Sequence, residues 1–381
     1  MSTTVETKTL RKTALNGLHR RLGAKMVDFG GWDMPVEYPS GGGLMKEHLA
    51  VRTGVGMFDV SHMGDILLRG PQALDMVQWV SMNDASKLQE GQAHYSALLY
   101  PEGTFVDDVI VHKLGQNDYL LVINAGTREK DYNWVRKNVT RFRGHADDVG
   151  DYYTQIAIQG PKAEATLQKL TNVDLPQIKN YWFQHGTVCG LPNTLIARTG
   201  YTAEDGFEIY VPSDPATSER VWNEVTEAGR EFGILPCGLG ARNTLRLEGK
   251  MALYGHEISD SINVWEANLD RFCKMDKGDF IGRASLEKAH AEGLKRALVG
   301  LEAVDRGIPR DGYKVCDGAG KEIGCVTSGS YAPFLKKNIA LAYVPPALSG
   351  IGTELFVEIR SQQVKCKVVP TPFYKRPKKS A

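Results

Sequence analysis

One layout occurs twice in the chain. The segments that share it, DILLRGPQALDMVQWV and IAIQGPKAEATLQKL, each run from a short apolar strand through Gly-Pro into a helix. Proline suits the first turn of a helix and is excluded from the interior of a sheet, so each Gly-Pro marks the junction. Residues at the same distances after Gly70 and after Gly160 fall on one face of each expected helix. They are Ala73, Met76, Val77 and Val80 in the first copy, and Ala163, Thr166, Leu167 and Leu170 in the second. The pattern predicts an α+β unit present in two copies.

The pattern changes from about residue 295. Short alternating runs follow, punctuated by Gly and Pro, among them ALVGLEA, NIALAYVP and GTELFVEI. Such runs are typical of a small all-β barrel or sandwich. The helical stretch FIGRASLEKAHAEG would link this part to the rest. We therefore expect two α+β subdomains and a helical linker in residues 1–290, and a β-barrel domain in residues 291–381, a division that suits 381 residues.

The charge and the cysteines narrow the function classes. The formal net charge is +1, which gives no electrostatic case for nucleic acid or a membrane surface as a partner. The basic ending KRPKKSA is expected to be a solvated tail. The six cysteines form no Cys-x-x-Cys or Cys/His pattern, so we expect no metal site and a reducing, cytoplasmic setting. No secretory signal and no run of ~18 apolar residues stands out.

Two adjacent acids lie in the expected strand FVDDVIVHKL. Side chains alternate between faces along a strand, so Asp107 and Asp108 point in opposite directions. Asp107 shares its face with Val109 and Val111, whereas Asp108 shares the other with Ile110 and His112. On periodicity alone, the valines favour Asp107 as the inward acid.

Other candidate residues suggest binding without defining a reaction. The strand GFEIYV leaves Glu208 and Tyr210 on the face opposite its apolar residues, which is either a solvent face or a polar site. Arg242 and Arg246 lie four apart on an expected helix and repel each other unless acids or an anionic ligand lie opposite. His62 is isolated and more typical of a structural histidine. The chain has no P-loop, nucleophile elbow or dinucleotide fingerprint.

An ordered series of motifs resembles one family. The series contains GAKMVDFGGWDMPVEY, AVRTGVGMFDVSHMGDILLRGP, DDVIV, NAGTREKD, QGPKA, RTGYTAEDGFEI, GLGARNTLRLE, SGSYAP and PFY. In this order, from about residue 12 to 375, they resemble the aminomethyltransferase (T-protein) of the glycine cleavage system. The resemblance implies a cloverleaf of three domains with tetrahydrofolate bound in the middle. It also implies an aminomethyl donor, the lipoylated H-protein, and a chain that we expect to be a monomer.

The resemblance carries specific residues with it. By motif, Asp108 matches the family's key carboxylate, the reverse of the choice that periodicity favours. The folate contacts of the family match Tyr95, Val122, Tyr201, Glu208, Arg242 and Tyr374. Three stretches depart from the family pattern: Ala203 replaces a glycine, Asn243 replaces an aspartate, and Asp270 and Arg271 stand where a small apolar pair is expected. The last of these raises the question of whether the donor is altered.

Three alternatives remain at this stage. The first is a folate-dependent demethylase acting on a small N-methyl or S-methyl compound. The second is a non-catalytic folate-binding protein for iron-sulfur assembly, whose hallmark K-G-C-Y-x-G-Q-E has its counterpart in EGKMALYGHEI, which lacks the cysteine. The third is a protein that has lost activity, favoured only if Asp108 or Glu208 points away from any cavity.

Overall fold

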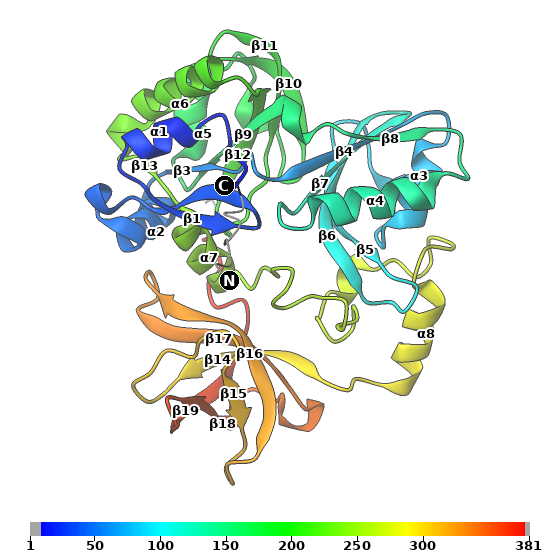
Figure 1. The fold of residues 1–381 in the computed structure, drawn as a ribbon, viewed down its shortest axis with the longest axis vertical. Coiled ribbons are helices and arrows are strands. Elements are labelled where there is room, and N and C mark those ends of the chain that lie inside the picture. Colours follow the sequence, from blue (N-terminus) through cyan, green and yellow to red (C-terminus); the bar gives the residue numbers. More distant parts are fainter. Residues whose placement is uncertain (1–8, 378–381) are drawn as a thin grey trace, which may run out of the picture.

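The chain forms three lobes around a common centre. The computed structural model describes residues 9–377, and Figure 1 shows the lobes as two α+β subdomains and a barrel. Helix α7 (Leu239–Glu248) lies where they meet. The predicted α+β cloverleaf is therefore confirmed, including the closed barrel at its C-terminal end.

The first subdomain is an antiparallel sheet with two helices. The strands lie in the order β5-β6-β7-β4-β8, and the two helices pack against each other. The bounds in chain order are β4 (Gly64–Arg69), α3 (Ala73–Val80), β5 (Ala93–Leu99), β6 (Phe105–Gly115), β7 (Asp118–Ile123), α4 (Arg128–Val139) and β8 (His145–Asp148).

The second subdomain repeats this arrangement. The strand order is β10-β11-β12-β9-β3-β13, so β10-β11-β12-β9 matches β5-β6-β7-β4. The bounds in chain order are β9 (Tyr153–Gln159), α5 (Ala163–Leu167), β10 (Phe183–Val188), β11 (Leu191–Ala197), β12 (Gly206–Pro212), α6 (Pro215–Gly229) and β13 (Leu235–Pro236). Strand β3 (Gly56–Asp59) precedes the first subdomain in sequence, yet pairs antiparallel with β9. The first copy is thus inserted between parts of the second.

The segment before β3 closes the centre on one side. It contains a two-stranded sheet, and its second helix packs against α7. The bounds are α1 (Asn16–Arg21), β1 (Lys25–Phe29), β2 (Trp32–Glu37) and α2 (Gly43–Thr53).

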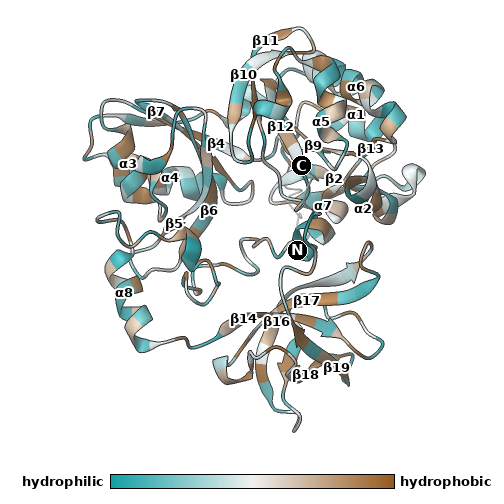
Figure 2. Cartoon of the chain, turned by 180° about the vertical axis from the view of Figure 1, so that it is seen from behind, coloured by the Kyte–Doolittle hydropathy of each residue, from teal (hydrophilic) through white to brown (hydrophobic). Residues whose placement is uncertain are grey.

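The C-terminal lobe is a closed six-stranded barrel. Helix α8 (Arg283–Glu292) leads into it along the outer edge of the cloverleaf (Figure 1). Figure 2 shows hydrophobic and hydrophilic segments following one another along its strands, as expected when one face of each strand looks inward. The bounds are β14 (Ala297–Ala303), β15 (Lys314–Cys316), β16 (Glu322–Ala332), β17 (Lys337–Val344), β18 (Glu354–Ile359) and β19 (Gln362–Val369).

The duplicated helical faces lie in two separate cores. Ala73, Met76, Val77 and Val80 are at most 1 % exposed in the core of the first subdomain. In the second, Ala163, Thr166 and Leu167 are fully buried and Leu170 packs at the edge of the core. A fully buried side chain of the size of Val or Leu stabilises the fold by roughly 1.5–3 kcal/mol. These faces therefore hold each copy together.

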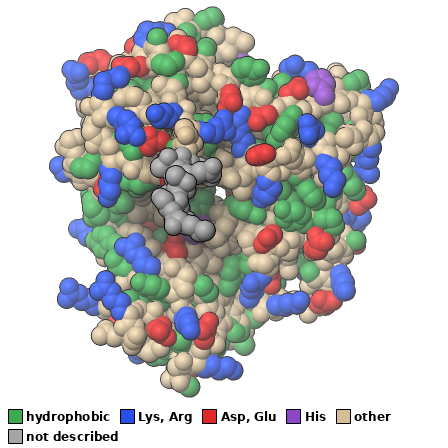
Figure 3. Space-filling view, in the orientation of Figure 1, with side chains coloured by type: hydrophobic (Ala, Val, Ile, Leu, Met, Phe, Trp, Pro, Cys, Tyr) green, Lys and Arg blue, Asp and Glu red, His purple; other side chains and the backbone are tan. Residues whose placement is uncertain are grey.

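The outer surface carries charges of both signs. Figure 3 shows basic and acidic side chains interspersed over the face seen in Figure 1, in keeping with the net charge of +1. Within residues 9–377, no helix has the length and apolar character needed to cross a membrane.

Candidate functional site

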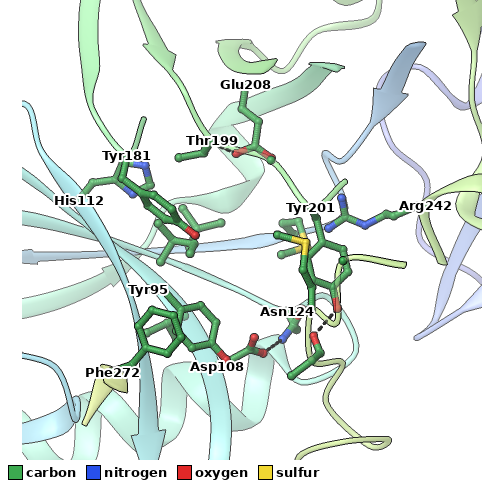
Figure 4. A pocket seen from close by; sticks show the side chains of 18 of the residues that line it. Tyr95, Asp108, His112, Asn124, Tyr181, Thr199, Tyr201, Glu208, Arg242 and Phe272 are labelled. Atoms are coloured by element: carbon green, nitrogen blue, oxygen red, sulfur yellow. Dashed lines mark hydrogen bonds between the residues drawn. The ribbon is translucent and has the colours of Figure 1, made fainter. Parts of the chain in front are cut away.

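A cavity of about 250 Å³ lies where the two subdomains meet α7. The first subdomain contributes side chains from β5, β6 and β7, and the second contributes β12 and the loop before it. Six of the seven predicted site residues line this cavity: Tyr95, Asp108, Val122, Tyr201, Glu208 and Arg242. Figure 4 shows the side chains of Tyr95, Asp108, Tyr201, Glu208 and Arg242 converging from separate elements. The third alternative, in which Asp108 or Glu208 points away from any cavity, therefore loses its support.

The two acids of β6 have different surroundings. Asp107 is fully buried, and its carboxylate accepts hydrogen bonds from the Thr127 hydroxyl and from the Asn124 amide, the latter at 2.8 Å. The same Asn124 nitrogen also donates to Asp108 at 2.8 Å. The expectation that Asp107 faces the protein interior is thus correct, and Asp108 faces the cavity on the other side.

The surroundings of Asp108 favour its neutral form. Burial and the neighbouring Asp107 carboxylate raise the pKa of Asp108 to about 7, although the Asn124 amide acts in the opposite direction. The Tyr95 hydroxyl points toward Asp108 in Figure 4, and burial together with this carboxylate raises the pKa of Tyr95 well above its ordinary value. A carboxyl group that titrates near neutral pH can exchange a proton with a ligand.

Glu208 and Arg242 face the cavity from β12 and α7. The Glu208 carboxylate accepts a hydrogen bond from the Thr199 hydroxyl, and burial raises the pKa of this acid. The Arg242 guanidinium lies 4.7 Å from the centre of the Tyr201 ring and has no salt bridge within residues 9–377. Burial lowers the pKa of Arg242, an effect that Tyr201 and Glu208 partly offset. The Glu208 carboxylate and the Arg242 guanidinium are therefore both available to a ligand.

The neighbouring Arg246 points away from the cavity lining and is bonded within the protein. It is 1 % exposed and donates to Glu257 Oε2 at 2.7 Å and to Ser328 Oγ at 2.7 Å. The question left open by the sequence is thus resolved geometrically. Arg246 joins α7 to the barrel, and Arg242 is the arginine that faces the cavity.

Tyr374 is not among the described residues that line the cavity. Its ring lies 4.0 Å below the guanidinium of Arg52 and 5.5 Å from the ring of Phe334. Burial and the Glu204 carboxylate raise the pKa of Tyr374 to about 12. The structure therefore places it at the junction of α2, the second subdomain and the barrel.

Several lining residues were not among the site residues predicted from the sequence. Asn124 follows the end of β7 and holds both acids, yet a lone asparagine after a strand is a common turn residue. His112 is 1 % exposed, and its ring lies 5.3 Å from the centre of the Phe183 ring. Tyr181 comes from the loop before β10, and Phe272 from the 3₁₀ helix η7 (Asp270–Phe272). Asn124 and Thr199 lie within the quoted motifs NAGTREKD and RTGYTAEDGFEI, but neither was predicted as a site residue.

Comparisons with known proteins assign the chain to a family. Residues 15–277 match the family model described as the GCVT N-terminal domain, and residues 296–375 match the glycine cleavage T-protein C-terminal barrel domain. The chain belongs to the glycine cleavage T-protein family. It is 72 % identical over 372 residues to the protein named aminomethyltransferase in Koribacter versatilis, covering 98 % of each chain. The aminomethyltransferase of Acidobacterium capsulatum is 70 % identical, also with 98 % of each chain covered.

A solved structure supports the same assignment. The crystal structure of the glycine cleavage system aminomethyltransferase T from Bartonella henselae has a TM-score of 0.89 and 32 % identity. The match covers 96 % of the present chain and 98 % of that one. The predicted membership of the T-protein family is therefore confirmed, and with it an enzyme of the aminomethyltransferase type.

The first departure from the T-protein pattern has a measurable cost. Ala203 has a φ of 61°, in the left-handed region that glycine adopts without cost. Its Cβ also approaches Gly249, where an added Cβ would meet it at 2.8 Å. The backbone of this lining segment is thus held in a conformation that alanine disfavours by about 1–2 kcal/mol.

Replacing Ala203 by glycine is expected to stabilise the protein. Glycine relieves the strain of about 1–2 kcal/mol in the folded protein. Its greater freedom in the unfolded chain lowers the stability by about 0.4–1 kcal/mol, so the net gain in the free energy of unfolding is about 0.5–1 kcal/mol. Unfolding in denaturant measures this change in the free energy of unfolding. The control Ala289→Gly, inside helix α8, should instead lower the free energy of unfolding by about 0.5–1 kcal/mol. Equal losses from both changes would contradict the strain at Ala203.

The other departures fall in two places. Asn243 Oδ1 accepts a hydrogen bond from Arg246 Nε at 2.8 Å, a role that an aspartate oxygen would also fill. Asp270 and Arg271 begin the 3₁₀ helix η7 (Asp270–Phe272), and Arg271 lines the cavity. Asn243 is therefore compatible with the packing around Arg246, whereas Arg271 adds a positive charge to the lining of the cavity.

A second, smaller cavity adjoins the first. It has a volume of about 190 Å³ and shares four lining residues with the larger one, Met63, Asn124, Tyr201 and Arg242. His62 lines only the smaller cavity, is 1 % exposed, and has a pKa lowered to about 4 by burial and by Arg242. The imidazole is thus neutral at pH 7.

Proposed function

We propose that the chain transfers the one-carbon unit of an aminomethyl-lipoyl H-protein to tetrahydrofolate. The observation that carries this proposal is that Asp108 and Glu208 face one buried cavity from two different subdomains. The carbon leaves the lipoyl sulfur and the amine, and it becomes bonded to N5 and N10 of the folate. The two protons released from these nitrogens end on the thiol and on ammonia. We place this reaction in the cytoplasm.

The residues at one end of the cavity fit a pterin. A pterin presents a ring N–H beside an exocyclic amino group, and the carboxylate of Glu208 can accept both hydrogen bonds. The Thr199 hydroxyl already holds one of its oxygens, so the acid is oriented before a ligand arrives. Tyr201 and Val122 offer apolar walls for the fused rings. Glu208 is therefore proposed to set the position of the folate.

Asp108 is the proposed catalytic residue. Its carboxyl group is held by Asn124, and its pKa of about 7 lets it take up a proton from N10 and release it again near neutral pH. In its ionised form it stabilises positive charge on the one-carbon unit as ammonia leaves. Arg242 carries no salt bridge within residues 9–377 and is proposed to orient ligand oxygens or the Glu208 carboxylate.

The smaller cavity could admit the donor separately from the folate. The folate and the aminomethyl group must reach Asp108 together, so they need separate spaces that meet. The smaller cavity meets the larger one at Asn124, which holds Asp108, and at Arg242. We propose that the aminomethyl end of the lipoyl arm enters there.

A donor comparison tests this function. Purified protein is mixed with tetrahydrofolate and either aminomethylated H-protein, dimethylglycine or sarcosine, and ammonia, 5,10-methylenetetrahydrofolate and 5-methyltetrahydrofolate are measured. With H-protein alone we expect ammonia and 5,10-methylenetetrahydrofolate in equal amounts, whereas transfer of a methyl group from a small methylamine would give 5-methyltetrahydrofolate. Folate-dependent turnover of a small methylamine, without turnover of H-protein, would instead support the demethylase. Absence of folate binding would exclude both reactions.

Replacing Glu208 by glutamine is expected to weaken tetrahydrofolate binding by about 10- to 100-fold. One of two acceptor oxygens is lost, and a hydrogen bond to a charged group contributes about 1.5–3 kcal/mol. The dissociation constant, measured by titration calorimetry, reports the change. Glu224→Gln, on the exposed side of α6, is the matched control and should leave it unchanged. Unchanged affinity in Glu208→Gln would contradict the proposed pterin contact.

A further inference from the structure

Two fully buried acids, Asp107 and Asp131, lie behind the wall of the smaller cavity. Asp107 belongs to β6, and Asp131 lies in the first turn of helix α4. The Asp131 carboxyl group donates a hydrogen bond to the Asp107 carboxylate. Two carboxyl groups share such a bond only when one of them is protonated. The pair therefore holds one transferable proton beside the cavity.

The surroundings of the pair keep this proton on Asp131. Burial and the Asp107 carboxylate raise the pKa of Asp131 to about 10, although the Lys130 ammonium acts in the opposite direction. Asp107 also accepts hydrogen bonds from the Asn124 amide and the Thr127 hydroxyl. Donors of this kind favour the ionised form of a carboxyl group. At pH 7 the proton therefore rests on Asp131.

Thr127 connects the acid pair to the smaller cavity. It lines this cavity, and its hydroxyl donates a hydrogen bond to Asp107. Thr127 is also the N-cap residue of α4, where a threonine hydroxyl usually accepts a hydrogen bond from the backbone of the first turn. Within residues 9–377 it makes no such capping bond. The hydroxyl is therefore directed to Asp107 rather than used to stabilise the helix.

Lys130 connects the pair to solvent. Its Nζ lies 3.5 Å from Asp131 Oδ1, and its side chain is 34 % exposed. The ammonium group also donates to the Val106 carbonyl and lies 4.0 Å from the centre of the Tyr254 ring. Because an ammonium group has three donors, it can return a proton to Asp131 and recover one from water. A proton from solvent therefore reaches Asp131 through Lys130.

We propose that Thr127, Asp107 and Asp131 form a proton relay that protonates the leaving sulfur of the donor in the smaller cavity. This inference rests on the proposed function, which brings the aminomethyl end of the lipoyl arm into that cavity. A thiolate leaves more readily when a positioned acid supplies a proton as its bond breaks. Asp108 faces the larger cavity and takes up the folate proton. The donor and the acceptor are therefore served by separate acids.

The transfer balances in electrons and protons. The electron pair of the carbon–sulfur bond stays on sulfur as the carbon passes to the folate. Sulfur takes the hydroxyl proton of Thr127, which takes a proton from Asp107, which takes the proton of Asp131. The Lys130 ammonium then returns a proton to the acid pair and recovers one from water. This uptake replaces the proton that Asp108 releases to solvent.

Kinetics of single and double variants test this relay. Thr127→Val and Asp131→Asn keep the shapes of the side chains but remove the acidic proton. With aminomethylated H-protein, we expect each to lower the turnover number by about 10²-fold, the low end for a positioned acid, because water still supplies the proton slowly. The double variant should be no slower than either single variant, because each change breaks the same relay. Thr127→Ser keeps the hydroxyl and should keep turnover within about threefold.

Folate binding and a matched control separate the relay from a structural role. The dissociation constant for tetrahydrofolate should change by less than about threefold in these variants, because the relay does not contact the acceptor. Thr140→Val, at the exposed C-terminal end of α4, should keep full turnover. Full turnover in Thr127→Val, losses that multiply in the double variant, or a parallel loss of folate affinity would overturn this inference alone. Absence of turnover with H-protein in the unmodified protein would overturn the proposed function.

Discussion

Replacing Asp108 by asparagine is expected to lower the turnover number by about 10²- to 10⁴-fold, the usual contribution of a positioned acid or base. Asparagine has nearly the same shape and can keep a hydrogen bond to Asn124, but it neither takes up a proton nor carries a negative charge. The dissociation constant for tetrahydrofolate should change by less than about threefold, because Glu208 lies at the other end of the cavity. Steady-state kinetics with H-protein and direct folate titration provide the two measurements.

The same variant should be more stable than the unmodified protein at alkaline pH. The folded-state pKa of Asp108 is about 7, above the ordinary value of 3.8, so the folded state holds this proton more tightly than the unfolded chain does. The stability from this group is present at low pH and is lost as pH rises through about 7. An asparagine side chain does not titrate and has no such loss. Relative to the unmodified protein, the variant should gain on the order of 2 kcal/mol between pH 5 and pH 8.

A surface acid provides the control for Asp108. Asp118 forms an exposed ion pair with Arg69 at 2.7 Å, so Asp118→Asn should keep full turnover and show no comparable gain at pH 8. An Asp108→Asn enzyme that retains more than about a tenth of the turnover would contradict the proposed role. An enzyme that loses turnover and folate affinity in equal measure would assign Asp108 to binding rather than to catalysis.

The parts of the fold that depend on local pattern were predictable from the sequence. Gly-Pro at the strand-helix junctions and the apolar offsets behind Gly70 and Gly160 predict the two copies, and the alternating C-terminal runs predict the barrel. The insertion of one copy into the other was not predictable. It depends on β3 pairing with β9, about 100 residues away, and no local signal specifies a partner at that separation.

The site was predicted by motif rather than by periodicity. Alternation along β6 correctly places Asp107 in the interior, but it says nothing of the ligand cavity that Asp108 faces. Asn124 was missed because its importance lies in one amide that contacts two carboxylates, which only the folded chain brings together. The roles of Arg242 and Arg246 differ because Glu257, on a separate loop, pairs with one of them.

Replacing Arg246 by methionine is expected to lower the free energy of unfolding by about 3–5 kcal/mol, because Glu257 would be left as a buried charge without its partner. Glu257 is fully buried and also accepts a hydrogen bond from the Thr327 hydroxyl at 2.6 Å, so its carboxylate cannot reach water. Glu257 lies in the loop after α7, and its bond from Thr327 connects the pair to strand β16. Loss of the pair therefore weakens the contact between α7 and the barrel. Urea unfolding of the intact chain measures the effect.

A double-mutant cycle separates the pair from the packing around it. Arg246→Met/Glu257→Leu removes both charges, and we expect the double variant to be more stable than either single variant, since no unpaired charge remains. Arg242→Met, one helical turn away and without a salt bridge in the described chain, is the matched control and should change the stability by less than about 1 kcal/mol. Additive losses in the double variant would show that Arg246 acts through its packing and its bonds to Asn243 and Ser328 rather than through the charge of Glu257.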